Sequence, residues 1–287
     1  MNSRTKEKTI YVCTACGQTH HGWMGKCSAC GEWNCIVEEK RTVARKQSSG
    51  SASVRALSIA ECRTTGQPTI ATGLNEFDQL LGGGLVTDSS LLIGGEPGIG
   101  KSTLMLQIMG LLAGKGLSVL YLTGEESTQQ IGLRAERLKI EASSLQVAAV
   151  RELPQVKQLL EQLTPQVVVI DSVQTLYDPD LESAPGTVSQ IRSATAELVD
   201  YCKRQGMLLI LIGHITKDGA IAGPKVLEHL VDVVLYFEGE KNNLFRILRA
   251  RKNRYGPTSE IGIFQIGHAG LEPVANPSEL FLEEYPA

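Results

Sequence analysis

The sequence has no excess of positive charge and no long apolar run. Its 28 Lys and Arg residues are balanced by 31 Asp and Glu, which gives a formal net charge of −3. Any binding to nucleic acid would therefore need a local basic surface. No apolar stretch approaches the roughly 18 residues of a membrane span, and the polar N-terminal segment has no secretory signal. These absences argue against a membrane or secreted protein, and we expect a cytoplasmic one that makes no membrane contact.

The composition is that of a soluble globular protein. Hydrophobic residues make up 42% of the 287 positions and charged residues 21%, enough to bury a sizeable core. This length fits one large domain and a small appendage. We expect a small metal-binding unit over residues 1–36, a flexible linker over 37–68 and the large domain over 69–287.

The sequence has few cysteines, and most of them lie close together near the N-terminus. Four of the seven cysteines lie within residues 13–30, as the pairs Cys13/Cys16 and Cys27/Cys30, each of the form C-x₂-C. Two such knuckles present four sulfurs to one tetrahedral ion, so the pattern predicts a zinc ribbon. The ten residues between the pairs are fewer than the usual spacing, although two hairpin turns need no more.

These thiols have uses other than binding zinc. Disulfides or redox thiols are the alternatives to zinc, and a cytoplasmic setting disfavours them. Cys35 lies nearby, but a fifth thiolate exceeds the tetrahedral set, so we interpret it as a bystander. His20 or His21 would serve as a ligand only in place of a cysteine.

The expected linker combines basic residues with small polar ones. Lys40, Arg41, Arg45 and Lys46 precede the run Ser-Ser-Gly-Ser at 48–51, with little apolar periodicity. Its charges are either simply solvated, which we favour, or in contact with nucleic acid.

From residue 69 onward, apolar runs alternate with amphipathic stretches. The alternation predicts a mainly parallel sheet with helices on both faces, followed by an antiparallel edge. The expected strands cover residues 91–94, 118–123, 146–150, 167–171, 207–212, 231–237, 245–251 and 260–265, and the expected helices 102–113, 127–138, 153–163 and 188–204.

A phosphate-binding motif joins the first of these strands to the first helix. The pattern G-x-x-x-x-G-K-[ST] is that of a P-loop, in which backbone N–H groups and a lysine hold the phosphates of ATP or ADP. The motif consists of Gly95, Glu96, Pro97, Gly98, Ile99, Gly100, Lys101, Ser102 and Thr103. Lys101 is expected at the β- and γ-phosphates, and the Ser102 hydroxyl at Mg²⁺.

Polar residues at other strand ends complete an ATP-hydrolysing site. Asp171 ends an apolar strand, as the second Mg²⁺-binding residue should. Glu125 and Glu126 follow another strand, and we expect Glu125 to activate water while Glu126 fits a helix N-terminus. His214 follows a third strand, where it either senses the γ-phosphate or plays a structural part.

Together these motifs resemble the RadA (Sms) family of bacterial DNA-repair ATPases. The resemblance covers nearly the whole chain and includes the ribbon, TGLNEFDQLLGGGL at 72–85, GGEPGIGKST at 94–103, LTGEES at 122–127, DSVQTLYDPDLESAPGTVSQIR at 171–192, GHITKDGAIAGPKVLEH at 213–229 and KNRYGPTSEIG at 252–262. It implies a RecA-like P-loop NTPase core, a hexameric ring and ATP-driven branch migration of DNA in homologous recombination. The implied partners are single-stranded or branched DNA, a RecA-type recombinase and a replicative helicase.

Family members usually continue into a Lon-protease-like domain that is said to help ring assembly. This sequence ends at Ala287, so we expect the chain to lack that domain.

Lys252 and Arg254 match the KNRFG motif of the family that the sequence resembles, here with Tyr255 in place of phenylalanine. The cations cluster at a strand end, so some must face solvent or a partner. A neighbour's cation in a ring ATPase stabilises charge on the γ-phosphate, which is the role we expect for these two residues. The alternative is a solvated charged hairpin.

DNA contact is the least visible function in the sequence. Lys217 and Lys225 flank a glycine-rich stretch after His214, which would face a ring's channel or form an ordinary surface loop. Trp23 and Trp33 offer the ribbon an apolar surface for a partner, for DNA or for its own packing. Two other functions remain open: a nucleotide-switched adaptor, and a RecA-fold ATPase with a signalling or kinase task.

Overall fold

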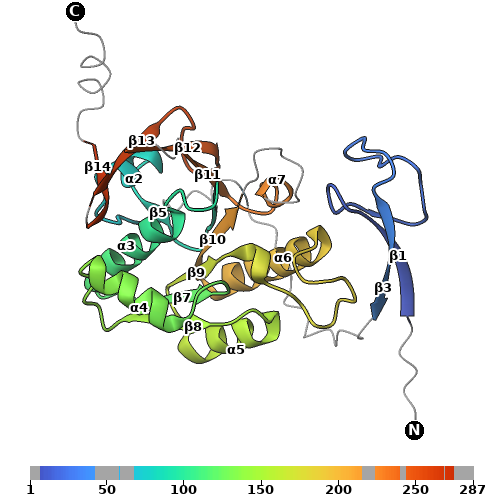
Figure 1. Ribbon diagram of the computed structural model, residues 1–287, viewed down its shortest axis with the longest axis horizontal. Helices are drawn as coiled ribbons and strands as arrows, with labels where there is room; N and C mark the ends of the chain where they lie inside the picture. Colours follow the sequence, from blue (N-terminus) through green and yellow to red (C-terminus); the bar gives the residue numbers. More distant parts are fainter. Residues whose placement is uncertain are drawn as a thin grey trace, which may run out of the picture.

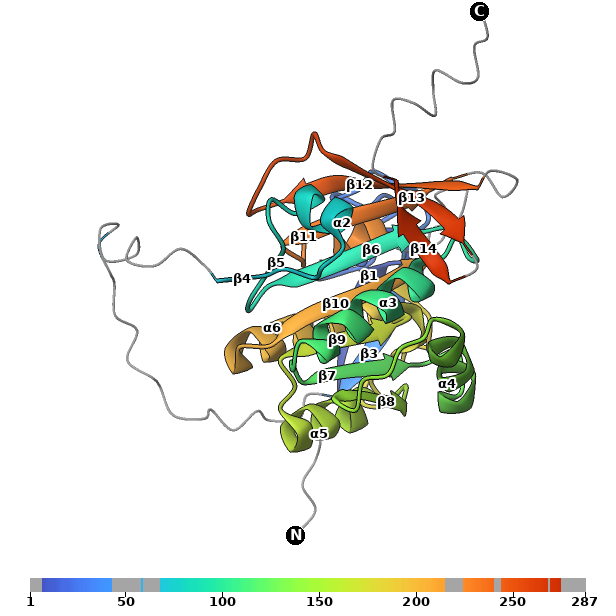
Figure 2. The ribbon, with the colours of Figure 1, turned by 90° about the vertical axis from the view of Figure 1, so that its left-hand side faces the viewer.

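A nine-stranded sheet organises the larger part of the molecule (Figure 1). The computed structural model describes residues 7–42, 58, 68–214, 224–239, 244–267 and 269–274. The strand order is β14-β13-β12-β11-β6-β10-β9-β7-β8, and Figure 2 shows the strands from β12 to β8 following one another in this order. The strands are β6 (Ser90–Gly95), β7 (Val119–Thr123), β8 (Leu145–Ala149), β9 (Val167–Asp171), β10 (Leu208–His214), β11 (Val233–Glu238), β12 (Phe245–Asn253), β13 (Ile261–Gly267) and β14 (Gly270–Pro273).

The sheet changes from parallel to antiparallel at β11. Strands β8, β7, β9, β10, β6 and β11 run parallel to one another, whereas β12, β13 and β14 are added as antiparallel neighbours. The expected α/β class, a mainly parallel sheet with a late antiparallel edge, is therefore confirmed. Strand β14 was not expected, and β12 and β13 each extend two residues past their predicted ends.

Helices cover both faces of the sheet because side chains alternate along each strand. In β9, Val167 and Val169 join the core under α3 and α4, while Val168 and Ile170 join the core under α5 and α6. The helices are α2 (Asn75–Leu80), α3 (Lys101–Gly114), α4 (Thr128–Arg137), α5 (Leu153–Leu163), α6 (Val188–Gln205) and α7 (Pro224–Leu227), with a 3₁₀ turn η1 (Val173–Thr175) after β9.

Local signals fix the helix ends. Ser127 and Gln130 form a reciprocal capping box that begins α4 directly after the Glu125–Glu126 turn. Gly206, with a φ of 70°, ends α6 in the left-handed conformation that favours glycine. Two smaller strands, β4 (Thr69–Ile70) and β5 (Leu85–Val86), pair with each other beside the core.

The cysteine-rich segment forms its own antiparallel sheet in the order β2-β1-β3. Its strands are β1 (Glu7–Cys13), β2 (Thr19–His20) and β3 (Ile36–Thr42). The assignment of residues 37–42 to an unstructured linker was wrong, because β3 pairs with β1 in register from Ile36 to Thr42. The remainder of the expected linker, apart from Ser58 and Pro68, lies outside the described residues.

The ribbon lies against helix α6 (Figure 1). The Arg192 guanidinium donates a hydrogen bond to the Gly17 carbonyl, directly after the first cysteine pair. Gly17 has a φ of 68°, and a Cβ there would lie 3.0 Å from Arg192 Cδ and 3.2 Å from Val188 Cγ1. Glycine at 17 therefore allows both the knuckle turn and the close approach of α6.

Within the segments that the structure describes, every helix is too short or too polar to cross a membrane.

Candidate nucleotide site and metal centre

The P-loop leaves the central strand β6 and enters α3. Gly98 and Gly100 have φ values of 79° and 114°, a conformation that side chains other than glycine rarely adopt. A Cβ at Gly95 would lie 2.6 Å from the Phe237 carbonyl oxygen, so this glycine is needed for close backbone approach. The loop and the first turn of α3 have the form of a phosphate cradle.

Lys101 is buried at the centre of this loop, with 3% of its surface exposed. Its Nζ donates hydrogen bonds of 2.8 Å to the carbonyl oxygens of Gly95 and Glu96 and lies 3.2 Å from His214 Nδ1. An ammonium has three N–H donors, and these contacts use all of them. Burial lowers the pKa of Lys101 to about 8, although the nearby charges of Asp171 and Glu125 oppose the shift.

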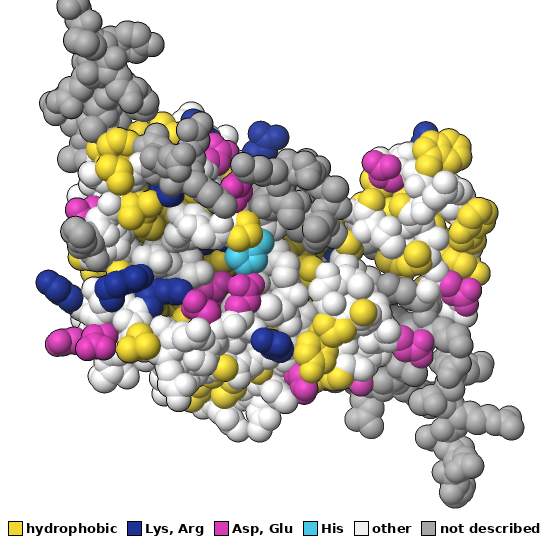
Figure 3. All heavy atoms as spheres, viewed as in Figure 1, with side chains coloured by type: hydrophobic (Ala, Val, Ile, Leu, Met, Phe, Trp, Pro, Cys, Tyr) yellow, Lys and Arg dark blue, Asp and Glu magenta, His cyan; other side chains and the backbone are white. Residues whose placement is uncertain are grey.

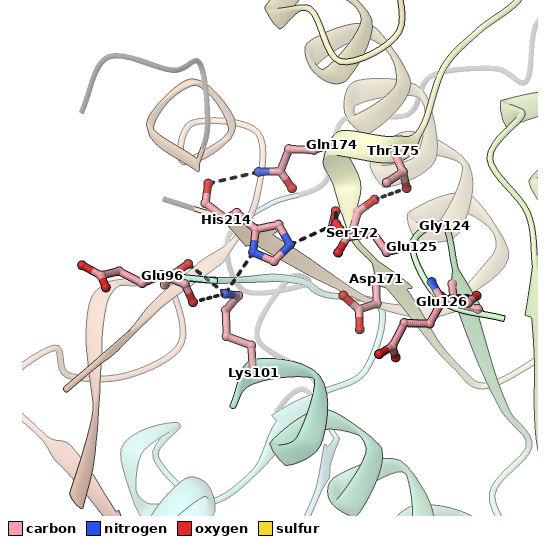
Figure 4. Close-up of polar contacts among 12 residues, drawn as sticks. Glu96, Lys101, Gly124, Glu125, Glu126, Asp171, Ser172, Gln174, Thr175 and His214 are labelled. Atoms are coloured by element: carbon pink, nitrogen blue, oxygen red, sulfur yellow. Dashed lines mark hydrogen bonds and ion pairs between the residues drawn. The ribbon is translucent and has the colours of Figure 1, made fainter. Parts of the chain in front are cut away.

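His214 joins Lys101 to Glu125 (Figure 4). It ends β10, where it pairs with Gly95 of β6 in register, so the sheet itself brings it to the P-loop. Because the ammonium of Lys101 can only donate, Nδ1 accepts, and the proton on Nε2 is directed at Glu125 Oε1, 3.0 Å away.

The two neighbouring glutamates have different partners. Glu125 also accepts a 2.5 Å hydrogen bond from the Ser172 hydroxyl. The hydrogen bond with His214 is the main reason that the pKa of Glu125 falls to about 2, so this carboxylate is ionised at neutral pH. Glu126 instead forms a 2.5 Å ion pair with Arg134 of α4. Of the two glutamates, Glu125 is therefore the one that contacts His214, which in turn contacts Lys101.

Asp171 ends β9 and is 5% exposed. Its Oδ2 accepts a 2.5 Å hydrogen bond from the hydroxyl of Tyr121, a fully buried residue of β7. Tyr121 is not predicted as a site residue from the sequence, because it lies within an apolar strand. Its alternation in β7 places it on the same face as Val119.

Further contacts that the sequence did not suggest hold the turn before Glu125. Arg151 Nε donates a 2.6 Å hydrogen bond to the Gly124 carbonyl. A Cβ on Gly124 would lie 1.8 Å from the Thr175 hydroxyl oxygen, so only glycine fits. Gln174 Nε2 donates to the His214 carbonyl at 3.1 Å. A pocket of about 450 Å³ opens beside Glu125 and includes Arg151.

These residues fit ATP or ADP with Mg²⁺. The P-loop supplies backbone donors and one cation, while Ser102, in the first turn of α3, and Asp171 supply the oxygen ligands that Mg²⁺ prefers. Thr103 follows Ser102 in the same turn.

Lys252 and Arg254 lie far from this cluster. Lys252 Nζ donates to the carbonyl oxygens of Glu228 and Val231, each at 2.7 Å. Arg254 pairs at 2.9 Å with Asp232, which also accepts hydrogen bonds from the backbone and hydroxyl of Ser90. Ser90 begins β6 and Gly95 ends it. These cations therefore lie at the amino-terminal end of β6, and the P-loop lies at its carboxyl-terminal end.

The two lysines expected at DNA are only partly described. Lys217 lies outside the described residues, and Lys225 falls in α7, where its side chain is likewise outside them. The face drawn in Figure 3 carries acidic and basic side chains together, with a histidine beside the acidic group.

The four paired cysteines converge in the ribbon. The Cys13–Cys30 and Cys16–Cys27 sulfurs lie 3.7 Å and 3.6 Å apart, and all four lie within 4.8 Å of one another. Sulfurs at about 2.3 Å from a tetrahedral zinc ion are separated by about 3.8 Å, so the set fits Zn²⁺. Although burial opposes ionisation, N–H donors of Cys30 and Ala29 and the nearby His20 lower the pKa of Cys27 to about 6.

Cys35 and His20 lie just outside this set. Cys35 Sγ is 3.3 Å from Cys13 Sγ and donates to the Glu32 carbonyl at 3.2 Å. Burial and the neighbouring Cys13 raise the pKa of Cys35 to about 11, which favours the neutral thiol over a ligating thiolate. His20 Nε2 lies 3.4 Å from Cys27 Sγ, as a residue that supports a ligand would.

This fold and this site define a P-loop NTPase of RecA-like architecture that carries a four-cysteine zinc ribbon. The model of a family described as AAA domain matches residues 64–220, and that of a rubredoxin metal binding domain matches residues 11–38. A KaiC-like protein of the archaeon Pyrococcus horikoshii OT3 has a similar fold, with a TM-score of 0.59 and 19% identity, covering 73% of this chain and 100% of that one.

Relatives of known name are much more similar in sequence. The chain is 49% identical over 285 residues to the DNA repair protein RadA of Bacillus subtilis (strain 168), and 48% identical over 280 residues to that of Rickettsia bellii (strain RML369-C). Each alignment covers 97% of this chain and 62% of the relative, so the chain spans less than two thirds of their length. The AAA domain model matches more than half of the chain, so the chain belongs to that family, and within it the chain is similar in sequence to proteins named RadA.

Proposed function

We propose that this chain is a DNA-dependent ATPase that acts as a ring-shaped motor on single-stranded or branched DNA, in homologous recombination and DNA repair. Its reaction would be ATP hydrolysis coupled to branch migration or strand separation. The names of the DNA repair proteins it is related to support the setting.

The observation that carries the proposal is the separation of Arg254 from the P-loop of its own chain. Asp232 holds Arg254 beside Ser90, and Gly95 lies five residue steps further along the strand, about 17 Å away. Arg254 remains 55% exposed in its side chain. Because Arg254 is exposed and lies this far from the P-loop of its own chain, we propose that it acts at the nucleotide site of another copy.

This separation favours a head-to-tail assembly. The nucleotide face and the Arg254 face are different surfaces, so their contact is heterologous and generates a closed ring or an open helix. We propose the ring, with six copies, as the resemblance in sequence suggests.

Each residue would then have a defined task. Lys101 exchanges its carbonyl partners for the β- and γ-phosphates, and Glu125 orients the attacking water. His214, which contacts both, reports the occupancy of the γ-phosphate position. Lys252 and Arg254 of a neighbour stabilise developing charge. Bound Mg²⁺ supplies charge neutralisation at the phosphates, from a site made by Ser102 and Asp171.

We place DNA in the channel of the ring. Lys217 and Lys225 remain our proposed phosphate contacts, and their segment follows His214 directly. A RecA-type recombinase and a replicative helicase are the proposed protein partners. We further propose a cytoplasmic location and the division into a ribbon, a linker and an ATPase core.

Stimulation of ATP hydrolysis by DNA tests the motor. We expect single-stranded DNA to raise the hydrolysis rate and Lys101→Ala to abolish it. Electron microscopy with an ATP analogue and single-stranded DNA should show rings. Hydrolysis that ignores DNA would contradict the proposal.

One feature favours a second candidate, a nucleotide-switched adaptor. Trp23 and Trp33 of the ribbon are 66% and 68% exposed, an apolar surface that suits a protein partner. An adaptor would bind ATP and recruit this partner without DNA stimulation. Transfer of phosphate to protein would instead indicate a kinase.

A further inference from the structure

Tyr121 places a hydroxyl group inside the hydrophobic core, at the base of the nucleotide site. The residue lies in β7, beside β9, where it pairs in register with Val169. None of its surface is exposed, and it is the largest of the fully buried side chains. A hydroxyl at such depth requires a hydrogen-bond partner. Its partner is Oδ2 of Asp171, 2.5 Å away.

This hydrogen bond has a defined direction. A carboxylate oxygen accepts hydrogen bonds, so the phenol of Tyr121 is the donor and Asp171 Oδ2 the acceptor. Among the described residues, no other side chain donates to the Asp171 carboxylate. Tyr121 thus occupies Oδ2, and in the described part of the chain Oδ1 accepts no side-chain hydrogen bond.

We propose that Tyr121 is a positioning residue for Mg²⁺ binding, which fixes the rotation of the Asp171 carboxylate so that Oδ1 faces the ion's hydration shell. The inference rests on the proposed function, since it assumes that the P-loop binds Mg²⁺ with a nucleotide. Partners of this kind commonly tune metal affinity about 10–100-fold.

The role differs from that of a core side chain that only fills space. Removing the hydroxyl alone keeps the aromatic ring and its packing, but leaves Asp171 Oδ2 buried without its donor. The carboxylate is then free to turn toward another donor, and this change weakens its hold on a hydrated cation. Nucleotide contacts that need no cation should be unaffected, because the hydroxyl that is removed donates to Asp171 and not to the P-loop.

The test is the binding of a fluorescent, non-hydrolysable ATP analogue in EDTA and across a Mg²⁺ titration. Tyr121→Phe should bind the analogue in EDTA within about twofold of wild type, which also reports an intact fold. Mg²⁺ increases the affinity for the analogue, and the Mg²⁺ concentration that gives half of this increase should rise about 10-fold in the variant. Tyr201→Phe is the matched control, because Tyr201 is another buried tyrosine, which α6 contributes to the core on the opposite face of the sheet.

A double-mutant comparison separates positioning from a general disturbance. If Tyr121 acts through Asp171, then adding Tyr121→Phe to Asp171→Asn should cause little further loss of the Mg²⁺-dependent gain. Fully additive losses would overturn the proposal, as would an unchanged Mg²⁺ titration in Tyr121→Phe. Wild-type protein that binds no analogue, or binds it without regard to Mg²⁺, would instead overturn the proposed function beneath it.

Discussion

Lys101 Nζ lies 3.2 Å from His214 Nδ1, and through that ring the P-loop lysine is connected to the Glu125 carboxylate. Lys101 comes from the loop after β6, His214 from the end of β10 and Glu125 from the turn after β7. Three elements that lie far apart in sequence therefore share one short chain of polar contacts. Because one imidazole contacts both the lysine that we propose for phosphate binding and the glutamate that we propose for water activation, we expect a substitution at either end to change the contacts of the other.

The lowered pKa of Lys101 predicts that nucleotide affinity falls at alkaline pH. Its pKa of about 8 lies below the ordinary 10.5, so the lysine loses its charge as the pH rises through 8. Phosphate needs the ammonium, and binding above pH 8 must therefore take up a proton. We expect the affinity for ATP to approach a tenfold loss per pH unit above about 8, with proton uptake measurable by calorimetry in buffers of different ionisation enthalpy.

Lys101→Met is the control for that pH dependence, because it removes the titrating group. Its residual affinity for ATP should be weak and nearly level between pH 7 and pH 9. A wild-type affinity that is equally level across this range would contradict the assignment of the shift to Lys101.

Glu125 and Glu126 should separate in their effects on turnover. Glu125→Gln should keep ATP bound while slowing hydrolysis roughly 10²–10⁴-fold, the usual range for loss of a general base. Glu126→Gln removes only the charge opposite Arg134, so hydrolysis should change far less. Single-turnover hydrolysis and analogue binding measure the two effects. If Glu126→Gln is the slow variant, the wrong glutamate has been assigned.

Zinc should depend on the four paired cysteines and not on Cys35. Purified protein should carry about one zinc ion per chain, and Cys27→Ser combined with Cys30→Ser should lose it. Cys35→Ser should retain the ion, since this thiol lies outside the fourfold set and its pKa is raised to about 11. Elemental analysis decides between these outcomes. Zinc retained by the double variant, or lost from Cys35→Ser, would contradict the ligand assignment.

The sequence predicts the parts of this molecule whose signals are local. The P-loop glycines, the four cysteines and the apolar strand before Asp171 each have a pattern within about 20 residues. The order of strands and helices follows from periodicity, and the positions of Glu125, Asp171 and His214 at the same sheet edge follow from parallel topology.

Contacts between residues that lie far apart in the chain could not be predicted from the sequence. Strand β3 reads as a charged linker because residues 38–41 are all charged, and only its register with β1 makes it a strand. Tyr121 reads as core because its hydroxyl partner comes 50 residues later. Asp232 and Ser90 are 142 residues apart, and no local signal indicates that this carboxylate anchors Arg254.

The placement of Arg254 leads to the prediction that it acts across a subunit boundary. Arg254→Ala should lower hydrolysis steeply, since arginine fingers contribute roughly 10³–10⁵ in rate. The fold of Arg254→Ala should persist, because Asp232 still accepts two hydrogen bonds from Ser90. The control is Arg204→Ala, which removes an exposed cation of α6 and should remain active.

Mixing Lys101→Ala with Arg254→Ala in equal amounts should pair an intact P-loop with an intact finger at about a quarter of the interfaces and recover activity to that extent. Co-assembly must be measured beside activity, by light scattering or by pull-down of differently tagged chains. A mixture that assembles yet stays as inactive as its components would show that Arg254 does not serve a neighbour's nucleotide.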